Sequence, residues 1–260
     1  MKTKLLGLLI ACSFTCSFAA SAHAAEPLKL RVGVEGAYPP FSSVGPDGKL
    51  KGFDIDIANA VCAQMGAQCT QVQQDFDGMI PALQARKFDF IVASLSITPE
   101  RQKVVDFSDK YYKTPNRLIT KASTPIDGSP ASFQGKKIGV QRSTINDRYA
   151  SEKFTGATIV RYAKQDEIYL DLAAGRVDAT LVDAVAGDAG FLKTPAGKGF
   201  ALTGPSYVDP AYFGLGVGIA MRKGDEALRT KLNAAIKAVR ASGEYKKIQD
   251  RYFDFDVYGQ

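Results

Sequence analysis

The sequence has 260 residues, of which 45% are hydrophobic and 23% are charged, with 33 Lys and Arg against 27 Asp and Glu. This composition is typical of a globular protein and excludes disordered, collagen-like and coiled-coil chains. The length suits one large domain or two smaller ones. The mild and dispersed positive charge does not indicate nucleic-acid binding.

The N-terminal segment has the pattern of a secretory signal peptide. Lys2 and Lys4 precede the apolar stretch Leu5–Ala11, and Ala22-His23-Ala24 provides a small-residue cleavage site. The alternative is a lipoprotein signal with Cys12 lipidated, which would leave a very short apolar stretch and an unused cleavage site. We therefore expect an exported protein that is released by cleavage.

Cleavage would limit the chemistry available to the mature chain. It removes His23, which is the one histidine, and leaves Cys62 and Cys69 as the cysteines. Such a chain cannot form a Ser-His-Asp triad, a Cys-His dyad, a His-ligated zinc site or a four-cysteine metal site. We therefore expect no metal and no cofactor. In an oxidising compartment, Cys62 and Cys69 should form a disulfide with each other.

The hydrophobic pattern predicts alternating strands and helices. In chain order, the predicted elements are strand Leu28–Val34, loop Glu35–Phe41, helix Phe53–Met65, helix Pro81–Arg86, strand Phe88–Ala93 and helix Asp225–Ala241. The strand at 88–93 is almost entirely apolar, as in a parallel sheet that is covered on both faces.

Two internal similarities favour two α/β lobes. Arg31–Glu35 is similar to Lys137–Gln141, and Leu83–Val92 is similar to Leu172–Leu181, in the same order along the chain. Any two βα units share some similarity, so the common order carries more weight than either pair. The chain would cross between the lobes at two Pro-containing stretches, Tyr112–Asn116 and Tyr207–Ala211.

Open α/β sheets bind ligands at the carboxyl ends of their strands. In lobe one these ends are Glu35 and Ala93–Ser96, and in lobe two they are Gln141–Thr144 and Asp183. The sequence therefore directs attention to these four places as a shared ligand site between the lobes.

Five motifs then occur in order between Leu28 and Tyr258. They are Tyr38-Pro39-Pro40-Phe41, Gly52-Phe53-Asp54-Ile55-Asp56, Ile80-Pro81-Ala82-Leu83, Ser94-Leu95-Ser96-Ile97-Thr98-Pro99-Glu100-Arg101 and Tyr252-Phe253-Asp254-Phe255-Asp256-Val257-Tyr258. Together they resemble the periplasmic solute-binding proteins of ABC importers for polar amino acids, in particular the lysine/arginine/ornithine- and histidine-binding branch. The resemblance implies a monomeric periplasmic protein that closes around one amino acid and delivers it to an inner-membrane ABC permease.

The resemblance also implies the type II periplasmic-binding-protein fold, an α/β fold with two lobes. Each lobe is a sheet flanked by helices, and two chain segments form the hinge. The expected boundaries are 1–24 for the signal peptide, 25–112 and 217–260 for lobe one, 113–116 and 208–216 for the hinge, and 117–207 for lobe two. Three positions depart from the family pattern, namely Glu35 in place of Asp, Ala93 in place of Ser, and Gln141 in place of Leu. These departures leave the exact ligand open.

The α-carboxylate of an amino acid needs a fixed partner in a closed site. Thr98-Pro99-Glu100-Arg101 reads as a helix start, which places Arg101 beside a serine-rich loop. A guanidinium suits a bidentate contact with a carboxylate. By its pattern alone, Arg101 is better interpreted as a solvated helix residue. The resemblance assigns it, together with Ala93, to the ligand site.

The resemblance gives ligand contacts to four further polar residues. Ser94 and Ser96 would hold the α-amino and carboxylate groups, Thr144 would present a helix N-terminus to the carboxylate, and Asp183 would pair with the α-ammonium. Each has a simpler interpretation, as a turn serine, a helix cap or a residue that begins a loop.

Aromatic residues and charge define the rest of the site. Tyr38 and Phe76 would stack against the ligand side chain, although either pattern also fits core packing. Asp54 and Asp56 lie at a predicted helix start, where they would act as caps or dipole partners outside the site. Once Arg101 and Asp183 hold the main chain of the ligand, Glu35 requires a second positive charge.

This matching of charges favours arginine as the ligand, then ornithine or lysine. Histidine, citrulline and opines are also possible ligands. Gln141 could bind the same head group as Glu35. Two other functions remain open on the sequence. One is an enzyme of the same fold, such as a cyclohexadienyl dehydratase, which would recruit Glu35 or Asp183 as acid or base. The other is an exported ligand sensor that does not serve transport.

Overall fold

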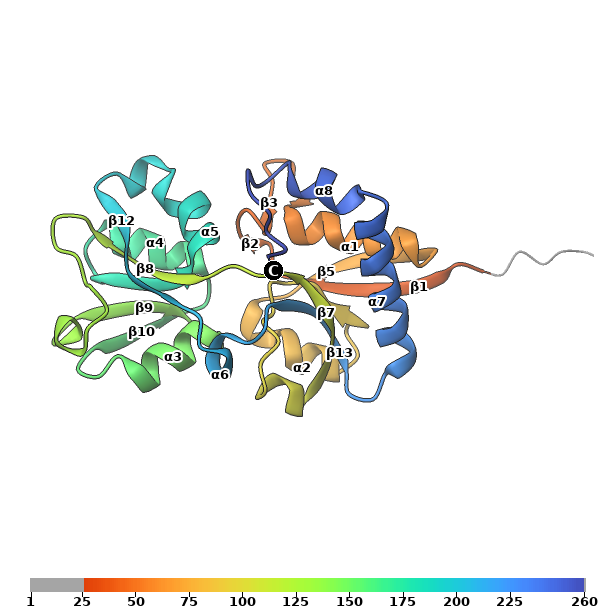
Figure 1. Ribbon diagram of the computed structural model, residues 1–260, viewed down its shortest axis with the longest axis horizontal. Coiled ribbons are helices and arrows are strands. Elements are labelled where there is room, and N and C mark those ends of the chain that lie inside the picture. Colours follow the sequence, from red (N-terminus) through yellow and green to blue (C-terminus); the bar gives the residue numbers. More distant parts are fainter. Residues whose placement is uncertain (1–25, 260) are drawn as a thin grey trace, which may run out of the picture.

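The computed structural model describes residues 26–259, and the predicted signal peptide lies outside them. These residues form two five-stranded sheets and one small three-stranded sheet. Figure 1 shows each five-stranded sheet with its own helices, as two lobes side by side that are joined by extended segments. The predicted two-lobed α/β fold class is confirmed. Within the described range, no helix is both long and apolar enough to cross a membrane.

Lobe one contains the N-terminal and C-terminal parts of the described chain. Its sheet has the spatial order β5-β1-β6-β13-β7, with β1 (Leu28–Val34), β5 (Ala67–Gln73), β6 (Phe90–Ile91), β7 (Val105–Tyr112) and β13 (Val217–Arg222). Its helices are α1 (Phe53–Gln64), α2 (Met79–Gln84), α7 (Glu226–Ala241) and α8 (Glu244–Gln249). The short strands β2 (Ala37–Tyr38), β3 (Ser42–Val44) and β4 (Leu50–Lys51) form the small sheet.

Lobe two is built from the middle of the chain. Its sheet has the order β10-β9-β11-β8-β12, with β8 (Asn116–Lys121), β9 (Lys137–Gln141), β10 (Thr158–Tyr162), β11 (Ala179–Asp183) and β12 (Phe200–Tyr207). Its helices are α3 (Ile145–Lys153), α4 (Gln165–Ala173) and α5 (Ala184–Gly187). Helix α6 (Pro210–Phe213) lies in the segment that leads from β12 back to β13.

The internal similarities in the sequence correspond to equivalent strands. β1 and β9 are the second strands of their sheets, and β6 and β11 are the third. In each sheet the first three strands are parallel to one another, and the last two are antiparallel to their neighbours. Gly33 in β1 and Gly139 in β9 are both closely covered, since an added Cβ would lie 2.6 Å from the Phe88 ring and from Ile168 Cγ2, respectively. The two lobes therefore repeat one packing arrangement.

The C-terminal amphipathic helix agrees with its predicted stripe. The apolar positions of α7 are buried, namely Leu228, Leu232, Ala235, Ile236 and Val239. The side chain of Asp225 caps this helix by accepting a 3.2 Å hydrogen bond from Leu228 N. In the same lobe, Cys62 of α1 and Cys69 of β5 form a disulfide with Cα atoms 6.1 Å apart, which confirms that prediction.

Four local predictions need correction. The predicted loop 35–41 contains the short strand β2 at Ala37–Tyr38, which pairs with β3. Helix α2 begins at Met79 and ends at Gln84, rather than covering 81–86. The predicted strand 88–93 is a strand at only Phe90–Ile91, because β6 pairs with β1 and β13 over two residues and the chain then turns at Ser94, whose φ is 52°. Arg101 begins a short 3-10 turn rather than lying in the first turn of an α-helix.

Candidate functional site

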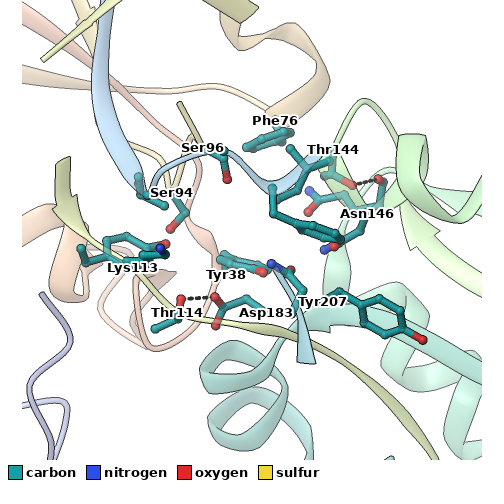
Figure 2. A pocket seen from close by; sticks show the side chains of 18 of the residues that line it. Tyr38, Phe76, Ser94, Ser96, Lys113, Thr114, Thr144, Asn146, Asp183 and Tyr207 are labelled. Atoms are coloured by element: carbon teal, nitrogen blue, oxygen red, sulfur yellow. Dashed lines mark hydrogen bonds between the residues drawn. The ribbon is translucent and has the colours of Figure 1, made fainter. Parts of the chain in front are cut away.

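A pocket lies between the two lobes, with about 790 Å³ of empty space including its open mouth. Figure 2 shows side chains from both sheets converging on it. The pocket is lined by nine of the ten predicted site residues: Glu35, Tyr38, Phe76, Ser94, Ser96, Arg101, Gln141, Thr144 and Asp183. The tenth, Ala93, does not line it and packs in the core of lobe one, with 2% of its surface exposed.

Glu35 and Gln141 meet across the pocket. Glu35 directly follows β1, and Gln141 is the last residue of β9, the equivalent strand of the other lobe. Gln141 Nε2 donates a 2.6 Å hydrogen bond to Glu35 Oε1. Both side chains are buried, with exposures of 5% and 3%. Burial raises the pKa of Glu35 to about 7, and the hydrogen bond from Gln141 opposes this shift. The carboxylate is therefore costly to ionise until a cation lies beside it.

Arg101 is a partly buried cation whose hydrogen-bond partners are neutral. Its main-chain N–H donates to Thr98 Oγ1 at 3.3 Å, and its guanidinium donates to the carbonyl of Ser96 at 3.2 Å and to that of Ser143 at 3.3 Å. The guanidinium also lies 5.6 Å from the centre of the Phe76 ring. Burial lowers the pKa of Arg101 to about 10. No ion pair within residues 26–259 involves Arg101, so its charge is available to an anionic group in the pocket.

Asp183 combines a structural contact with a place in the pocket. It is the N-cap of α5, because its Oδ1 accepts hydrogen bonds from Val185 N at 2.9 Å and Ala186 N at 3.1 Å. Its other carboxylate oxygen accepts from the hydroxyl of Thr114, as the dashed line in Figure 2 marks. Burial raises the pKa of Asp183 to about 6, and these hydrogen bonds oppose the shift. A loop-initiating role and a ligand role are therefore compatible here.

Thr144 likewise caps a helix at the pocket. Its hydroxyl accepts from Asp147 N at 3.1 Å and donates to the carbonyl of Gln141 at 2.7 Å. The preceding residue, Ser143, has a φ of 63°, so the chain turns sharply between β9 and α3. Because Thr144 lines the pocket, the N-terminus of α3 begins at its wall, where main-chain N–H groups favour an anion.

Sequence reasoning missed several lining residues. They are Tyr112, Lys113, Thr114 and Asn116 near the first crossing, Tyr207, Val208, Phe213, Gly214, Gly216 and Val217 near the second, and Ile145, Asn146 and Gln165 from lobe two. Asn146 Oδ1 and the Tyr207 hydroxyl are buried without a hydrogen-bond partner. The two Pro-containing crossings were the available signal, since segments that join two lobes must pass their shared cleft.

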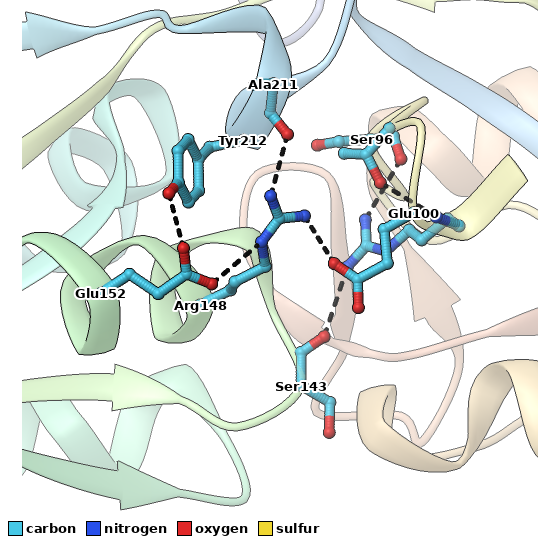
Figure 3. Close-up of polar contacts among 9 residues, drawn as sticks. Ser96, Glu100, Ser143, Arg148, Glu152, Ala211 and Tyr212 are labelled. Carbon is cyan, nitrogen blue, oxygen red and sulfur yellow. Dashed lines mark hydrogen bonds and ion pairs between the residues drawn. The ribbon is translucent and has the colours of Figure 1, made fainter.

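Ion pairs also bridge the lobes outside the pocket lining. Arg148 of α3 pairs with Glu100 at 2.5 Å, and Arg142 pairs with Asp77 at 2.5 Å. Figure 3 shows Arg148 also reaching the carbonyl of Ala211, at 3.1 Å, and Glu152. The pairs with Glu100 and Asp77 join the two lobes around the pocket, whereas Glu152 lies on the same helix as Arg148.

Two lobes that enclose a small charged pocket at their strand ends define a binding protein for small solutes. The chain belongs to the bacterial extracellular solute-binding proteins, family 3, whose family model matches residues 30–255. Its sequence is 55% identical to an L-arginine-binding protein of Pseudomonas aeruginosa, over 88% of this chain and 90% of that protein. It is 46% identical to the lysine/arginine/ornithine-binding periplasmic protein of Escherichia coli, over the full length of both.

Solved structures agree with the sequence relatives. One is a periplasmic binding protein of Salmonella typhimurium described as having high arginine specificity. Its TM-score with this chain is 0.80 at 35% identity, and the match covers 87% of this chain and 99% of that one. The resemblance seen in the sequence motifs is therefore confirmed at the level of family and fold.

Proposed function

We propose that this protein captures a cationic L-amino acid between its lobes, with arginine preferred over ornithine, lysine and histidine. The observation that carries the proposal is the buried Glu35 carboxylate joined to Gln141 of the other lobe at the pocket wall. A cationic side chain placed there would satisfy Glu35 and contact both lobes at once, so it would favour the closed form.

The charges in the pocket match a ligand with one anionic and two cationic groups. Arg101 suits the α-carboxylate and Asp183 the α-ammonium, which leaves Glu35 for the side chain. Lys113 also lines the pocket but is exposed, so water weakens its repulsion of a cation. A neutral side chain, such as that of glutamine, would leave the buried Glu35 without a countercharge.

Arginine fits the part of the pocket at Glu35 and Gln141 better than lysine does. The bond between Gln141 and Glu35 uses the amide nitrogen and one carboxylate oxygen. The amide oxygen of Gln141 and the second oxygen of Glu35 can then accept hydrogen bonds from a ligand. A guanidinium presents several N–H donors in one plane, whereas an ammonium is a point charge.

We further propose that the protein acts in the periplasm as a monomer and delivers its ligand to an inner-membrane ABC permease. Residues 25–112 and 217–260 would move as one lobe and 117–207 as the other, about hinge segments 113–116 and 208–216. We propose binding rather than catalysis because Glu35, Arg101 and Asp183 each have a charged counterpart on a free cationic amino acid.

Calorimetry of the mature protein against a panel of amino acids tests this proposal. Arginine should bind most tightly, followed by ornithine and lysine, while glutamine and glutamate should bind weakly. Native mass spectrometry of the freshly purified protein should show one bound cationic amino acid per chain. Preferred binding of a neutral or acidic amino acid would contradict the proposal.

A further inference from the structure

Asp54 is a buried carboxylate directly behind the pocket. It lies in the first turn of α1 and has no exposed surface. Its Oδ1 accepts a 2.8 Å hydrogen bond from the Tyr111 hydroxyl, and its Oδ2 accepts a 2.9 Å hydrogen bond from Ser94 Oγ. Asp54 does not line the pocket, but Ser94 does. The carboxylate therefore acts on the pocket through Ser94.

The bond to Asp54 determines what Ser94 can offer a ligand. A serine hydroxyl has one proton to donate and two lone pairs that accept. Because Ser94 donates its proton to Asp54, its oxygen can only accept from a group in the pocket. Ser94 also has a φ of 52°, a left-handed conformation that is unusual for serine and needs support from its surroundings.

We propose that Asp54 is a positioning residue that makes Ser94 an acceptor for the α-ammonium of the ligand and so selects amino acids over analogues without the α-amino group. The inference rests on the proposed function. It adds a residue, Asp54, that helps the site to recognise the α-amino group of the ligand. It differs from the role predicted from the sequence, which was a cap or dipole partner of the helix.

Electrostatics support this role. Burial raises the pKa of Asp54 to about 7, hydrogen bonds from Tyr111 and Ser94 oppose the shift, and the nearby charge of Asp183 adds to it. Asp54 and Asp183 repel each other, so one ammonium bound near Ser94 would stabilise both carboxylates. An ammonium is thus favoured by charge as well as by hydrogen-bond polarity.

The same helix offers a matched control. Asp56 lies two residues further along α1 and is also in the first turn. Its carboxylate accepts from the Tyr252 hydroxyl and pairs with Arg251 at 3.2 Å, on a face that does not line the pocket. A dipole or folding role predicts similar effects for both positions, whereas the positioning role predicts an effect on ligand choice for Asp54 alone.

The test compares arginine with 5-guanidinopentanoate, which is arginine without its α-amino group. Calorimetry gives the ratio of the two affinities for the wild type, Asp54→Asn and Asp56→Asn. Asp54→Asn keeps the shape but removes the charge, and its amide can turn to donate to Ser94. We expect the preference for arginine to fall about tenfold or more in Asp54→Asn, the size of one charge-assisted hydrogen bond, and to be unchanged in Asp56→Asn.

A double variant separates action through Ser94 from a general effect. In a Ser94→Ala background, Asp54→Asn should change the ratio clearly less than it does in the wild-type background, because only the direct effect of the charge remains. A folded Asp54→Asn protein with the wild-type ratio would overturn the inference while leaving the proposed function intact. Wild-type protein that binds no cationic amino acid would instead refute the proposed function.

A crystal structure of the wild type with arginine gives a measurement that does not depend on the variant folding. It should place Ser94 Oγ within hydrogen-bonding distance of both Asp54 and the α-nitrogen. A Ser94 hydroxyl that contacts the ligand carboxylate, or no ligand atom, would overturn the inference.

Discussion

Gln141 and Glu35 are 106 residues apart in the chain, yet their side chains are joined by a 2.6 Å hydrogen bond at the wall of the pocket. They occupy equivalent places in the two lobes, at the carboxyl ends of β1 and β9. Because each lobe contributes one partner, this bond is available only when the lobes approach. The pair therefore links ligand selectivity to lobe closure.

Replacing Glu35 tests that selectivity directly. Glu35→Gln preserves the shape but removes the charge, so arginine should bind more weakly by about 1–3 kcal/mol, the cost of losing a charge-assisted bond. Neutral citrulline should improve relative to arginine. Competition titration of the two ligands against both proteins measures the change. An unchanged arginine-to-citrulline preference would remove Glu35 from the selectivity site.

Arg101 should affect all amino-acid ligands alike. Arg101→Ala removes the proposed partner of the α-carboxylate, which every amino acid carries, and should cost about 3–5 kcal/mol for each ligand. Arg101→Lys keeps the charge but loses the planar fork, so it should recover only part of the affinity. Calorimetry with arginine and lysine checks both variants. Affinities of Arg101→Ala within about threefold of the wild type would contradict the assignment.

The sequence predicted the family, the repeated lobes and nine of the residues that line the pocket, because these depend on local patterns. Glu35 and Gln141 were found because both lie at the carboxyl ends of predicted strands. Asn146 and Tyr207 were not, because their place at the pocket depends on how one lobe sits against the other. Asp54 was read as a helix dipole partner, and its burial depends on Tyr111, 57 residues away. Ala93 was included on family grounds although its strand end turns it into the core.

The disulfide should stabilise the fold without shaping the site. Cys62 and Cys69 close a loop of about eight residues, for which the chain-entropy relation gives about 2–3 kcal/mol. The double variant Cys62→Ser/Cys69→Ser should therefore unfold at lower denaturant concentration while arginine affinity stays close to the wild type, because neither cysteine lines the pocket. Urea unfolding and calorimetry measure the two effects. A large loss of affinity in the folded variant would argue against this separation.

The ion pairs that bridge the lobes should favour the closed form by a modest amount. Arg148–Glu100 and Arg142–Asp77 are partly exposed, so each contributes little and is weakened by salt. The double variant Glu100→Gln/Asp77→Asn should weaken arginine binding by less than about tenfold. The ratio of wild-type to variant affinity should move towards one as salt is raised. A ratio that is insensitive to salt would show that these pairs act in another way.

The acidic groups of the site predict opposite pH effects on the free and the bound protein. Burial raises the pKa of Glu35 to about 7, of Asp54 to about 7 and of Asp183 to about 6. Unfolded carboxyl groups titrate near pH 4. A pKa raised by folding contributes stability below the unfolded value and loses it as pH rises through the folded value. The ligand-free protein should therefore become less stable between about pH 4 and pH 7.

Bound arginine should oppose this loss of stability at higher pH, because its two cationic groups favour ionised carboxylates. Binding below about pH 6 must displace protons, so affinity should rise with pH from 5 to 8. The measurement is the melting temperature with and without saturating arginine across this range, with Glu35→Gln as the matched variant. The increase caused by arginine should grow with pH in the wild type and grow less in Glu35→Gln. An increase that is the same at all pH values in the wild type would show that these carboxylates do not take up the charge of the ligand.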